Sequence, residues 1–216
     1  MEYHTKYADI QSVKIKKIIT LTLLFSLFSS MPAFSYYVMY KEQFYKLYHV
    51  HYQQYPTDVI ENIYWLEKAS KADFCNPQCA LSKIQNETEW EKYRYLFNMH
   101  INLKLIEQHL RLARVYDKKV AYFYDAPWKE EYLSDLKLAQ DCYETALMYW
   151  DEVKIWAEKA SMKQFQFITL TDIQNWEDER YRIQNNELDY EKIITRELER
   201  VKKVQNDFMQ MDENTY

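Results

Sequence analysis

The chain has 216 residues, contains no glycine, and carries a formal net charge of −5. Without glycine it lacks the glycine-rich loops that hold phosphates in P-loop and Rossmann proteins, and the tight turns of β-hairpins are disfavoured as well. An acidic chain without a long basic run is also a poor binder of nucleic acid or of an anionic membrane. The composition therefore predicts an all-α protein whose helices are joined by Asp, Asn and Pro turns.

The N-terminal segment has the three-part layout of a secretory signal peptide. Residues 14–17 supply a basic flank, residues 18–28 form an apolar run, and small residues precede a cleavage site between Ser35 and Tyr36. The apolar run is short for a membrane span. We therefore predict a cleaved signal peptide at residues 1–35, with an uncleaved signal anchor as the alternative.

The rest of the chain, residues 36–216, is long enough for a single all-helical domain. Residues 1–35 carry a net charge of +2, so their removal leaves a net charge of −7. We hypothesise that translation begins at Val13, which would give the signal peptide a compact basic start. Export to the periplasm or to the outside of the cell is the expected localisation, with no membrane contact beyond the signal segment.

The first two expected helices lie close together in the sequence. Residues 36–54 place aromatic and aliphatic side chains at helical spacing, and Pro56 ends this helix. Thr57 and Asp58 follow as capping residues of a second helix at residues 59–72.

A short helix and the longest helix of the chain come next. Asn76 caps the short helix, with Pro77 in the first position, a placement that proline favours. The long central helix covers residues 88–124 and opens with Thr88 and Glu91 in the Ser/Thr-x-x-Glu pattern of a capping box.

The central helix is apolar on more than one face. One stripe consists of Leu96, Met99, Leu103, Ile106, Leu110 and Ala113, continued by Val120 and Phe123. A second set consists of Trp90, Phe97, Ile101, Leu105, Leu112 and Val115. A helix with two apolar faces must pack on more than one side, so we expect this helix to organise the fold.

Three more helices are expected after it. The first covers residues 128–162 and the second residues 173–184, and Asp189 caps the last one. The stripe of the first consists of Leu133, Leu136, Ala139, Tyr143, Ala146, Tyr149, Trp150, Val153 and Ala157. The last helix has the near-heptad spacing of a coiled coil and a charged outer face.

Two places in the chain resemble the tetratricopeptide repeat family. The spacing of Ala139, Tyr143 and Ala146 is similar to the small–aromatic–small pattern of that family's second helix. A second segment is similar to that family's turn into the next repeat. It consists of Leu66-Glu67-Lys68-Ala69, followed by Asp73 and Asn76-Pro77. The resemblance implies antiparallel helix pairs stacked into a curved surface that holds peptides or partner proteins. An irregular helical bundle is the alternative, because core packing alone produces the same spacings.

No catalytic, cofactor-binding or metal site is predicted. The histidines lack the His-Glu-x-x-His and Glu-x-x-His spacings of zinc and di-iron sites, and His100 and His109 fall on different faces of the central helix. Acidic residues 177–179 lie near Arg180 and Arg182, which favours a salt-bridged surface over an acid/base pair.

Two of the three cysteines are close in sequence. Cys75 and Cys79 bracket a short helix entry, where either a disulfide or two free thiols is compatible with the spacing. Cys142 lies in the middle of an expected helix, a poor position for a nucleophile.

These patterns lead to two main functional expectations. The first is an exported, non-enzymatic helical protein that binds a protein or peptide partner, such as a scaffold subunit of a secretion apparatus or a periplasmic flagellar motor. The second is a periplasmic solute-binding or carrier protein with a pocket lined by Tyr and Trp. An envelope hydrolase is a third alternative.

Overall fold

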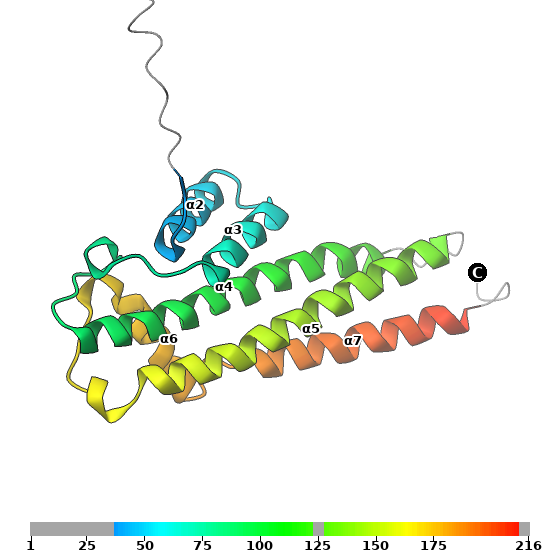
Figure 1. The fold of residues 1–216 in the computed structure, drawn as a ribbon. Helices are drawn as coiled ribbons and strands as arrows, with labels where there is room; N and C mark the ends of the chain where they lie inside the picture. Colours follow the sequence, from blue (N-terminus) through cyan, green and yellow to red (C-terminus); the bar gives the residue numbers. More distant parts are fainter. Residues whose placement is uncertain (1–36, 123–127, 212–216) are drawn as a thin grey trace, which may run out of the picture. The chain divides into compact units, whose positions relative to one another are not determined.

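The computed structural model describes residues 37–122 and 128–211, and six α-helices account for most of them (Figure 1). These helices are α2 (Lys41–Gln54), α3 (Val59–Lys71), α4 (Glu87–Tyr122), α5 (Lys129–Ala160), α6 (Gln174–Gln184) and α7 (Tyr190–Gln210). The described residues contain no β-strand, only an isolated bridge between Tyr40 and Asp73. The predicted all-α fold class is confirmed.

Helix α4 starts one residue before the predicted position because a different residue caps it. Asn86 Oδ1 accepts a hydrogen bond from the Glu89 amide at 2.9 Å, and the Glu89 carboxylate accepts from the Gln85 amide at 2.7 Å. The capping residues are therefore Asn86 and Glu89, and the predicted box of Thr88 and Glu91 is wrong. Asparagine is the better N-cap of the two, and Glu89 stands three residues after it.

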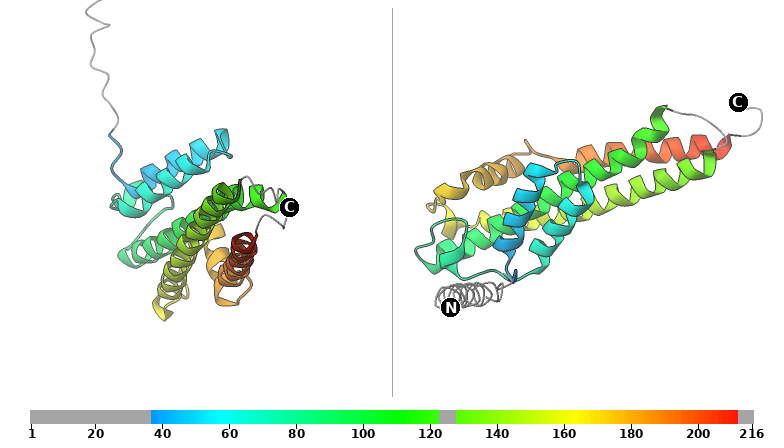
Figure 2. Two further views of the ribbon diagram at one scale, coloured as in Figure 1. Left: turned by 90° about the vertical axis from the view of Figure 1, so that its right-hand side faces the viewer. Right: turned by 90° about the horizontal axis from the view of Figure 1, so that it is seen from above.

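Helix α4 packs on several sides, as its two apolar faces predict. The whole stripe from Leu96 to Ala113 is buried, and so is most of the second set, whereas Val115 is exposed. Helices α3, α5 and α6 all pack against α4, and α3 runs antiparallel to it. Figure 2 shows α2 and α3 side by side against α4, with α7 alongside α5.

Helices α5 and α7 form an antiparallel pair. Near one end, Lys129 Nζ donates to the Met211 carbonyl at 2.6 Å, and near the other, Lys154 pairs with Glu191 at 3.1 Å. The predicted stripe of α5 faces inward from Leu136 to Ala157, with Leu133 and Tyr149 half-buried at its margins. Asp189 caps α7 as predicted, since its side chain accepts from the Lys192 amide.

The α2–α3 pair differs from prediction at its start. Residues 37–40 lie outside α2, because the Gln43 side chain accepts hydrogen bonds from the Met39 and Tyr40 amides and fixes the helix start at Lys41. Asp58 caps α3 as predicted, accepting from the Glu61 amide at 3.2 Å.

The expected short helix is a single 3₁₀ turn, Pro77–Cys79. Asn76 Oδ1 accepts from the Gln78 amide at 2.8 Å, so the predicted cap and the position of Pro77 are both confirmed. Two further 3₁₀ turns, Lys163–Phe165 and Thr171–Ile173, connect α5 to α6.

All six helices belong to one compact unit, Val38–Tyr216. None of the helices in the described part of the chain is both long and apolar enough to cross a bilayer. The predicted translation start at Val13 and the predicted cleavage site between Ser35 and Tyr36 lie outside the described residues.

Candidate functional site

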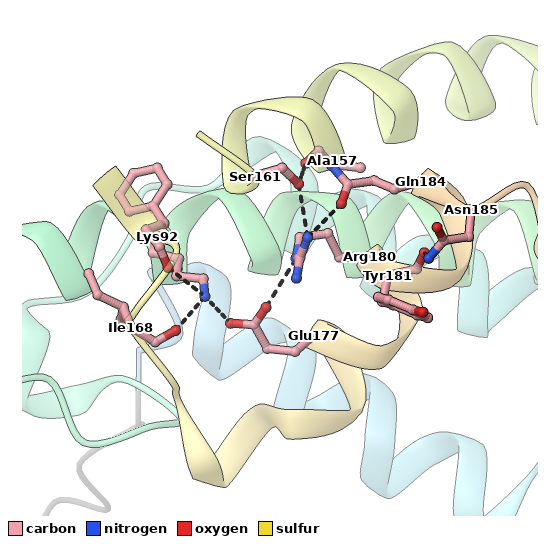
Figure 3. A network of polar contacts seen from close by, with 10 residues as sticks. Lys92, Ala157, Ser161, Ile168, Glu177, Arg180, Tyr181, Gln184 and Asn185 are labelled. Carbon is pink, nitrogen blue, oxygen red and sulfur yellow. Dashed lines mark hydrogen bonds and ion pairs between the residues drawn. The ribbon is translucent and has the colours of Figure 1, made fainter. Parts of the chain in front are cut away.

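A network of ion pairs and hydrogen bonds fixes the connection between α5 and α6 to α4. Lys92 of α4 is buried and forms an ion pair with Glu177 of α6 (Figure 3). Its ammonium group also donates to the Ile168 carbonyl at 2.6 Å and to the Phe165 carbonyl at 3.5 Å. A lysine has three donors, and these three acceptors can satisfy all of them.

Glu177 is shared between two cations. Arg180 Nε donates to Glu177 Oε2 at 3.1 Å, and another guanidinium nitrogen of Arg180 donates to Ser161 Oγ and to Gln184 Oε1 (Figure 3). This arrangement orients the Arg180 fork across the end of α5. Glu177 therefore lies between Lys92 and Arg180 and joins α4 and α6 in one ion-pair network.

A surface pocket of about 400 Å³ opens beside this network. Its charged and polar lining consists of Lys92, Ser161, Lys163, Gln166, Thr169, Gln174, Glu177, Asp178, Arg180 and Gln184. Apolar contacts come from Ala160, Met162, Phe165 and Ile168. The pocket thus offers both signs of charge and no Tyr or Trp side chain.

A second polar cluster links α2, α4 and α6 through a chain of hydrogen bonds. His100 Nδ1 lies 2.5 Å from a Glu179 carboxylate oxygen, His100 Nε2 lies 2.7 Å from the Tyr45 hydroxyl, and that hydroxyl lies 2.8 Å from His49 Nε2. The tautomers of His49 and His100 decide which group donates at each contact, and the Tyr45 hydroxyl can donate to one ring and accept from the other.

Burial favours the neutral forms of two of these groups, the His49 imidazole and the Tyr45 phenol. Burial lowers the pKa of His49 and raises the pKa of Tyr45. The Tyr45 ring makes edge contacts with Phe97 and Trp176, and the Trp176 ring stacks on His100 at 4.8 Å. These hydrogen bonds therefore join α2, α4 and α6. The Tyr45 phenol is a poor nucleophile, because its pKa is raised.

A protein-family profile described as a domain of unknown function, DUF8513, matches residues 88–211. The match covers more than half of the chain. The chain belongs to the DUF8513 family. No curated protein and no solved structure shows significant similarity to it. The matched region contains nearly all of α4 and the whole of α5, α6 and α7, whereas α2 and α3 precede it.

The DUF8513 region contributes the whole Lys92–Glu177–Arg180 network, while the second cluster connects that region to α2. The sequence predicts that the acidic residues 177–179 lie on a salt-bridged surface. The ion pairs exist, but Glu177 and Glu179 are half-buried, because they meet Lys92 and His100 of α4. These partners lie 85 and 79 residues away, a separation at which no local motif is visible.

His100 and His109 lie on different faces of α4, as predicted. His100 contacts Glu179 and Tyr45, whereas His109 packs its ring against Tyr149 at 5.5 Å. No group of three or more His, Cys, Asp and Glu side chains in the described ranges has an arrangement that could hold a metal ion.

The three cysteines are free thiols in the structure. Cys75 is buried, and burial, followed by the charge of Glu42, raises the pKa of its thiol to about 12. Cys79 is exposed. Cys142 is half-buried, and burial raises the pKa of its thiol. The disulfide between Cys75 and Cys79 stays a prediction that depends on the redox state of the compartment.

Proposed function

We propose that this DUF8513 protein is an exported, non-enzymatic helical protein whose surface binds a protein or peptide partner. The observation that carries the proposal is the outward face of α5. Met148 and Ile155 are 70% and 45% exposed and lie seven residues apart, on the side of the helix opposite its buried stripe. Exposed apolar side chains mark interaction surfaces where they form a patch.

The α2–α3 pair offers a second exposed apolar surface. Phe44 of α2 stacks on Trp65 of α3 with ring centroids 6.4 Å apart, and Tyr64 meets Trp65 edge-on at 4.9 Å. Ile60 and Tyr64 are both exposed. Aromatic side chains of this kind are enriched in protein interfaces.

The placement of the aromatic residues favours partner binding over the alternative of a solute carrier. Tyr45, Phe97 and Trp176 pack on one another within the core, and the pocket beside Lys92 is lined by charged and polar groups. A carrier for an apolar solute would instead need an aromatic-lined cavity. The raised pKa values of the Cys75 thiol and the Tyr45 phenol support the non-enzymatic reading, since a nucleophile needs the opposite shift.

The finer expectations belong to the same proposal. Ala139, Tyr143 and Ala146 are all buried, as the small–aromatic–small pattern of a tetratricopeptide helix requires. The unequal helix lengths, 36 and 32 residues in α4 and α5 against 14 and 13 in α2 and α3, favour the irregular bundle. A scaffold role in a secretion apparatus or a periplasmic flagellar motor rests on the predicted export.

Capture of partners from the native cell tests the proposal. The full chain carrying a C-terminal tag is cross-linked in intact cells, purified and analysed by mass spectrometry, with an unrelated exported protein as the control. We expect at least one envelope protein to be recovered in stoichiometric amount with the tagged chain alone. A small molecule retained in native mass spectrometry, with no enriched protein, would support the carrier alternative instead.

Export itself is tested by sequencing the N-terminus of the protein in the envelope fraction. We expect the mature chain to begin at Tyr36. Recovery of an intact segment 18–28 in washed membranes would refute cleavage and support the signal anchor.

A further inference from the structure

We propose that the pocket beside Lys92 binds the C-terminal residue of a peptide or protein partner, with the terminal carboxylate held by Arg180 and Lys163. This inference rests on the proposed partner-binding function and names a site and the chemical group that occupies it. Three features of the pocket carry it: the unused donors of Arg180, the balance of charge, and the mixture of neutral polar and apolar groups in the wall.

Arg180 has two unused donors although its side chain is held in a fixed orientation. A guanidinium group has five N–H donors. The Nε atom of Arg180 donates to Glu177, and one terminal nitrogen donates to Ser161 Oγ at 3.0 Å and to Gln184 Oε1 at 2.7 Å. The other terminal nitrogen has no hydrogen-bond partner in the part of the chain that the structure describes. All three acceptors line the pocket, so the guanidinium lies in its wall, oriented before any ligand arrives (Figure 3).

The pocket carries an excess of positive charge, although the chain as a whole has a formal net charge of −5. Lys92 and Arg180 share the single carboxylate of Glu177, which leaves an excess of one formal positive charge. The exposed side chains of Lys163 and Asp178 add one charge of each sign, so the excess stays at one. This balance favours a ligand group with a single negative charge, such as a carboxylate. A phosphate group, with a charge of about −1.5 to −2, would reverse it.

Lys163 provides the second cation that is available to a ligand. It begins the 3₁₀ turn after α5, is exposed, lines the pocket, and forms no ion pair with any residue in the described ranges. Lys92 differs, because its three donors are occupied by Glu177 and by two backbone carbonyls. Lys92 therefore contributes charge to the pocket, whereas Arg180 and Lys163 contribute the hydrogen bonds.

The rest of the wall suits the remainder of a C-terminal residue. Neutral side chains that can hydrogen-bond an amide group are Gln166, Thr169, Gln174 and Gln184. Apolar contacts come from Ala160, Met162, Phe165 and Ile168. Met162 is 41% exposed, so an apolar ligand side chain would remove apolar surface from water there. A volume of about 400 Å³ is near the lower end of the range for ligand pockets, which fits one residue and the amide before it.

A peptide C-terminus fits these features better than a free amino acid does. It combines a carboxylate, an amide and a side chain, which correspond to the cations, the neutral polar groups and the apolar groups of the wall. A free amino acid also carries an ammonium group, which would restore the positive charge that the pocket already has in excess. Capture of a C-terminal carboxylate is one of the recurring modes of peptide recognition.

Two small molecules of nearly equal shape serve as probes. N-acetyl-leucine ends in a carboxylate, and N-acetyl-leucinamide ends in a neutral amide. Binding of each to the full chain is measured by saturation-transfer NMR titration at two salt concentrations. We expect the acid to bind about tenfold more tightly than the amide, because hydrogen bonds to an ionised group are the stronger ones. Binding of the acid should weaken as salt increases.

Three variants of the chain locate the contact. Arg180→Gln should weaken binding of N-acetyl-leucine about tenfold. Lys163→Gln, at an exposed position, should weaken it about threefold and reduce its salt dependence. Arg182→Gln removes the same charge from an exposed position of α6 outside the pocket lining and should leave binding unchanged. Circular dichroism checks that each variant folds, and Lys163→Gln together with the comparison of acid and amide decides the matter if Arg180→Gln does not.

Other outcomes would overturn the inference. Equal binding of the acid and the amide, or binding of neither, would show that the pocket does not select a carboxylate. Equal losses in Arg180→Gln and Arg182→Gln would place the contact elsewhere. Free leucine that binds as tightly as N-acetyl-leucine would assign the pocket to an amino acid. Displacement of the acid by inorganic phosphate at lower concentration than by acetate would assign it to a phosphate group.

The same variants separate this inference from the proposed function. If cross-linking in cells recovers the same partner with the wild type and with Arg180→Gln, the pocket is not the docking site, while partner binding stands. If the wild type recovers no specific partner, the proposed function itself fails, whatever the pocket binds in the NMR titration.

Discussion

Replacing Arg200 with alanine tests the polar contact that joins α4, α5 and α7. Asp117 of α4 is only 2% exposed, accepts a hydrogen bond from the Tyr143 hydroxyl at 2.7 Å, and forms an ion pair with the Arg200 guanidinium. Without Arg200 the carboxylate remains buried with the phenol of Tyr143 as its donor and without its paired cation. An uncompensated buried charge is among the few changes that destabilise a protein strongly.

The expected loss follows from the geometry of the pair. Removing one partner of a buried ion pair costs about 3–5 kcal/mol. The Arg200 side chain is 40% exposed, so water replaces part of its interaction, and we expect a loss of about 2–3 kcal/mol in the free energy of unfolding. For a domain of this size, each 1 kcal/mol lowers Tm by about 2–4 °C, so Tm should fall by about 4–12 °C.

Arg196 on the same helix is a matched control. Its side chain is exposed and pairs with Glu197, which also accepts a hydrogen bond from Arg200, so both variants lose a contact to the same carboxylate. Arg196→Ala should cost less than about 1 kcal/mol, as exposed ion pairs do.

Urea unfolding followed by circular dichroism at pH 7 measures both variants, and a double-mutant cycle of Arg200→Ala with Tyr143→Phe measures their coupling. The two losses should not add, because both partners act on Asp117. Equal, small losses in Arg200→Ala and Arg196→Ala would refute the view that a buried carboxylate depends on this cation.

Three further predictions concern other parts of the chain. Leu110→Ala should lower the free energy of unfolding by about 2–5 kcal/mol, because Leu110 is buried against neighbouring helices. Arg114→Ala, at an exposed position, should leave the urea midpoint nearly unchanged. Similar midpoints for the two variants would show that the apolar stripe of α4 is not part of the core. Burial lowers the pKa of His109 below 6.5, so its contribution to stability is present above about pH 6.5 and is lost as pH falls through the lowered pKa. His109→Leu should therefore lose less stability between pH 7 and pH 5 than the wild type, and an unchanged pH dependence of urea unfolding would refute this assignment. In timed alkylation of the native protein with peptide mapping, exposed Cys79 should react before buried Cys75, whose pKa is raised to about 12; protection of both until a reductant is added would indicate the disulfide.

The sequence predicted best those features that depend on neighbouring residues. Asp58 and Asp189 cap their helices through amides three residues ahead, a local interaction that the pattern reveals. The inward stripe of α5 was predictable for a similar reason, since a helical period alone decides which side chains share a face. At α4 the structure places the cap at Asn86, two residues before Thr88, the cap that the sequence predicted.

Polar contacts between distant segments were not predictable. Glu179 meets His100, and Asp117 meets Arg200, only because α4, α6 and α7 pack as they do. In the sequence these residues look like ordinary members of charged helix faces. The pocket beside Lys92 also depends on the 3₁₀ turn after α5, for which no sequence signal was recognised.

The hydrogen bonds between α2 and α4 have a consequence for how the N-terminal helix pair sits on the family region. Aliphatic side chains alone would allow two helices to slide along each other at modest cost, whereas Tyr45 must meet His100 while Glu42 accepts from Tyr93. A shift of one helical turn, about 5.4 Å, would break both contacts at once and leave buried polar groups without partners. The α2–α3 pair therefore has a single low-energy docking position on α4. Its exposed aromatic surface and the outward face of α5 consequently stay at a constant distance, which a partner that contacts both surfaces would have to match.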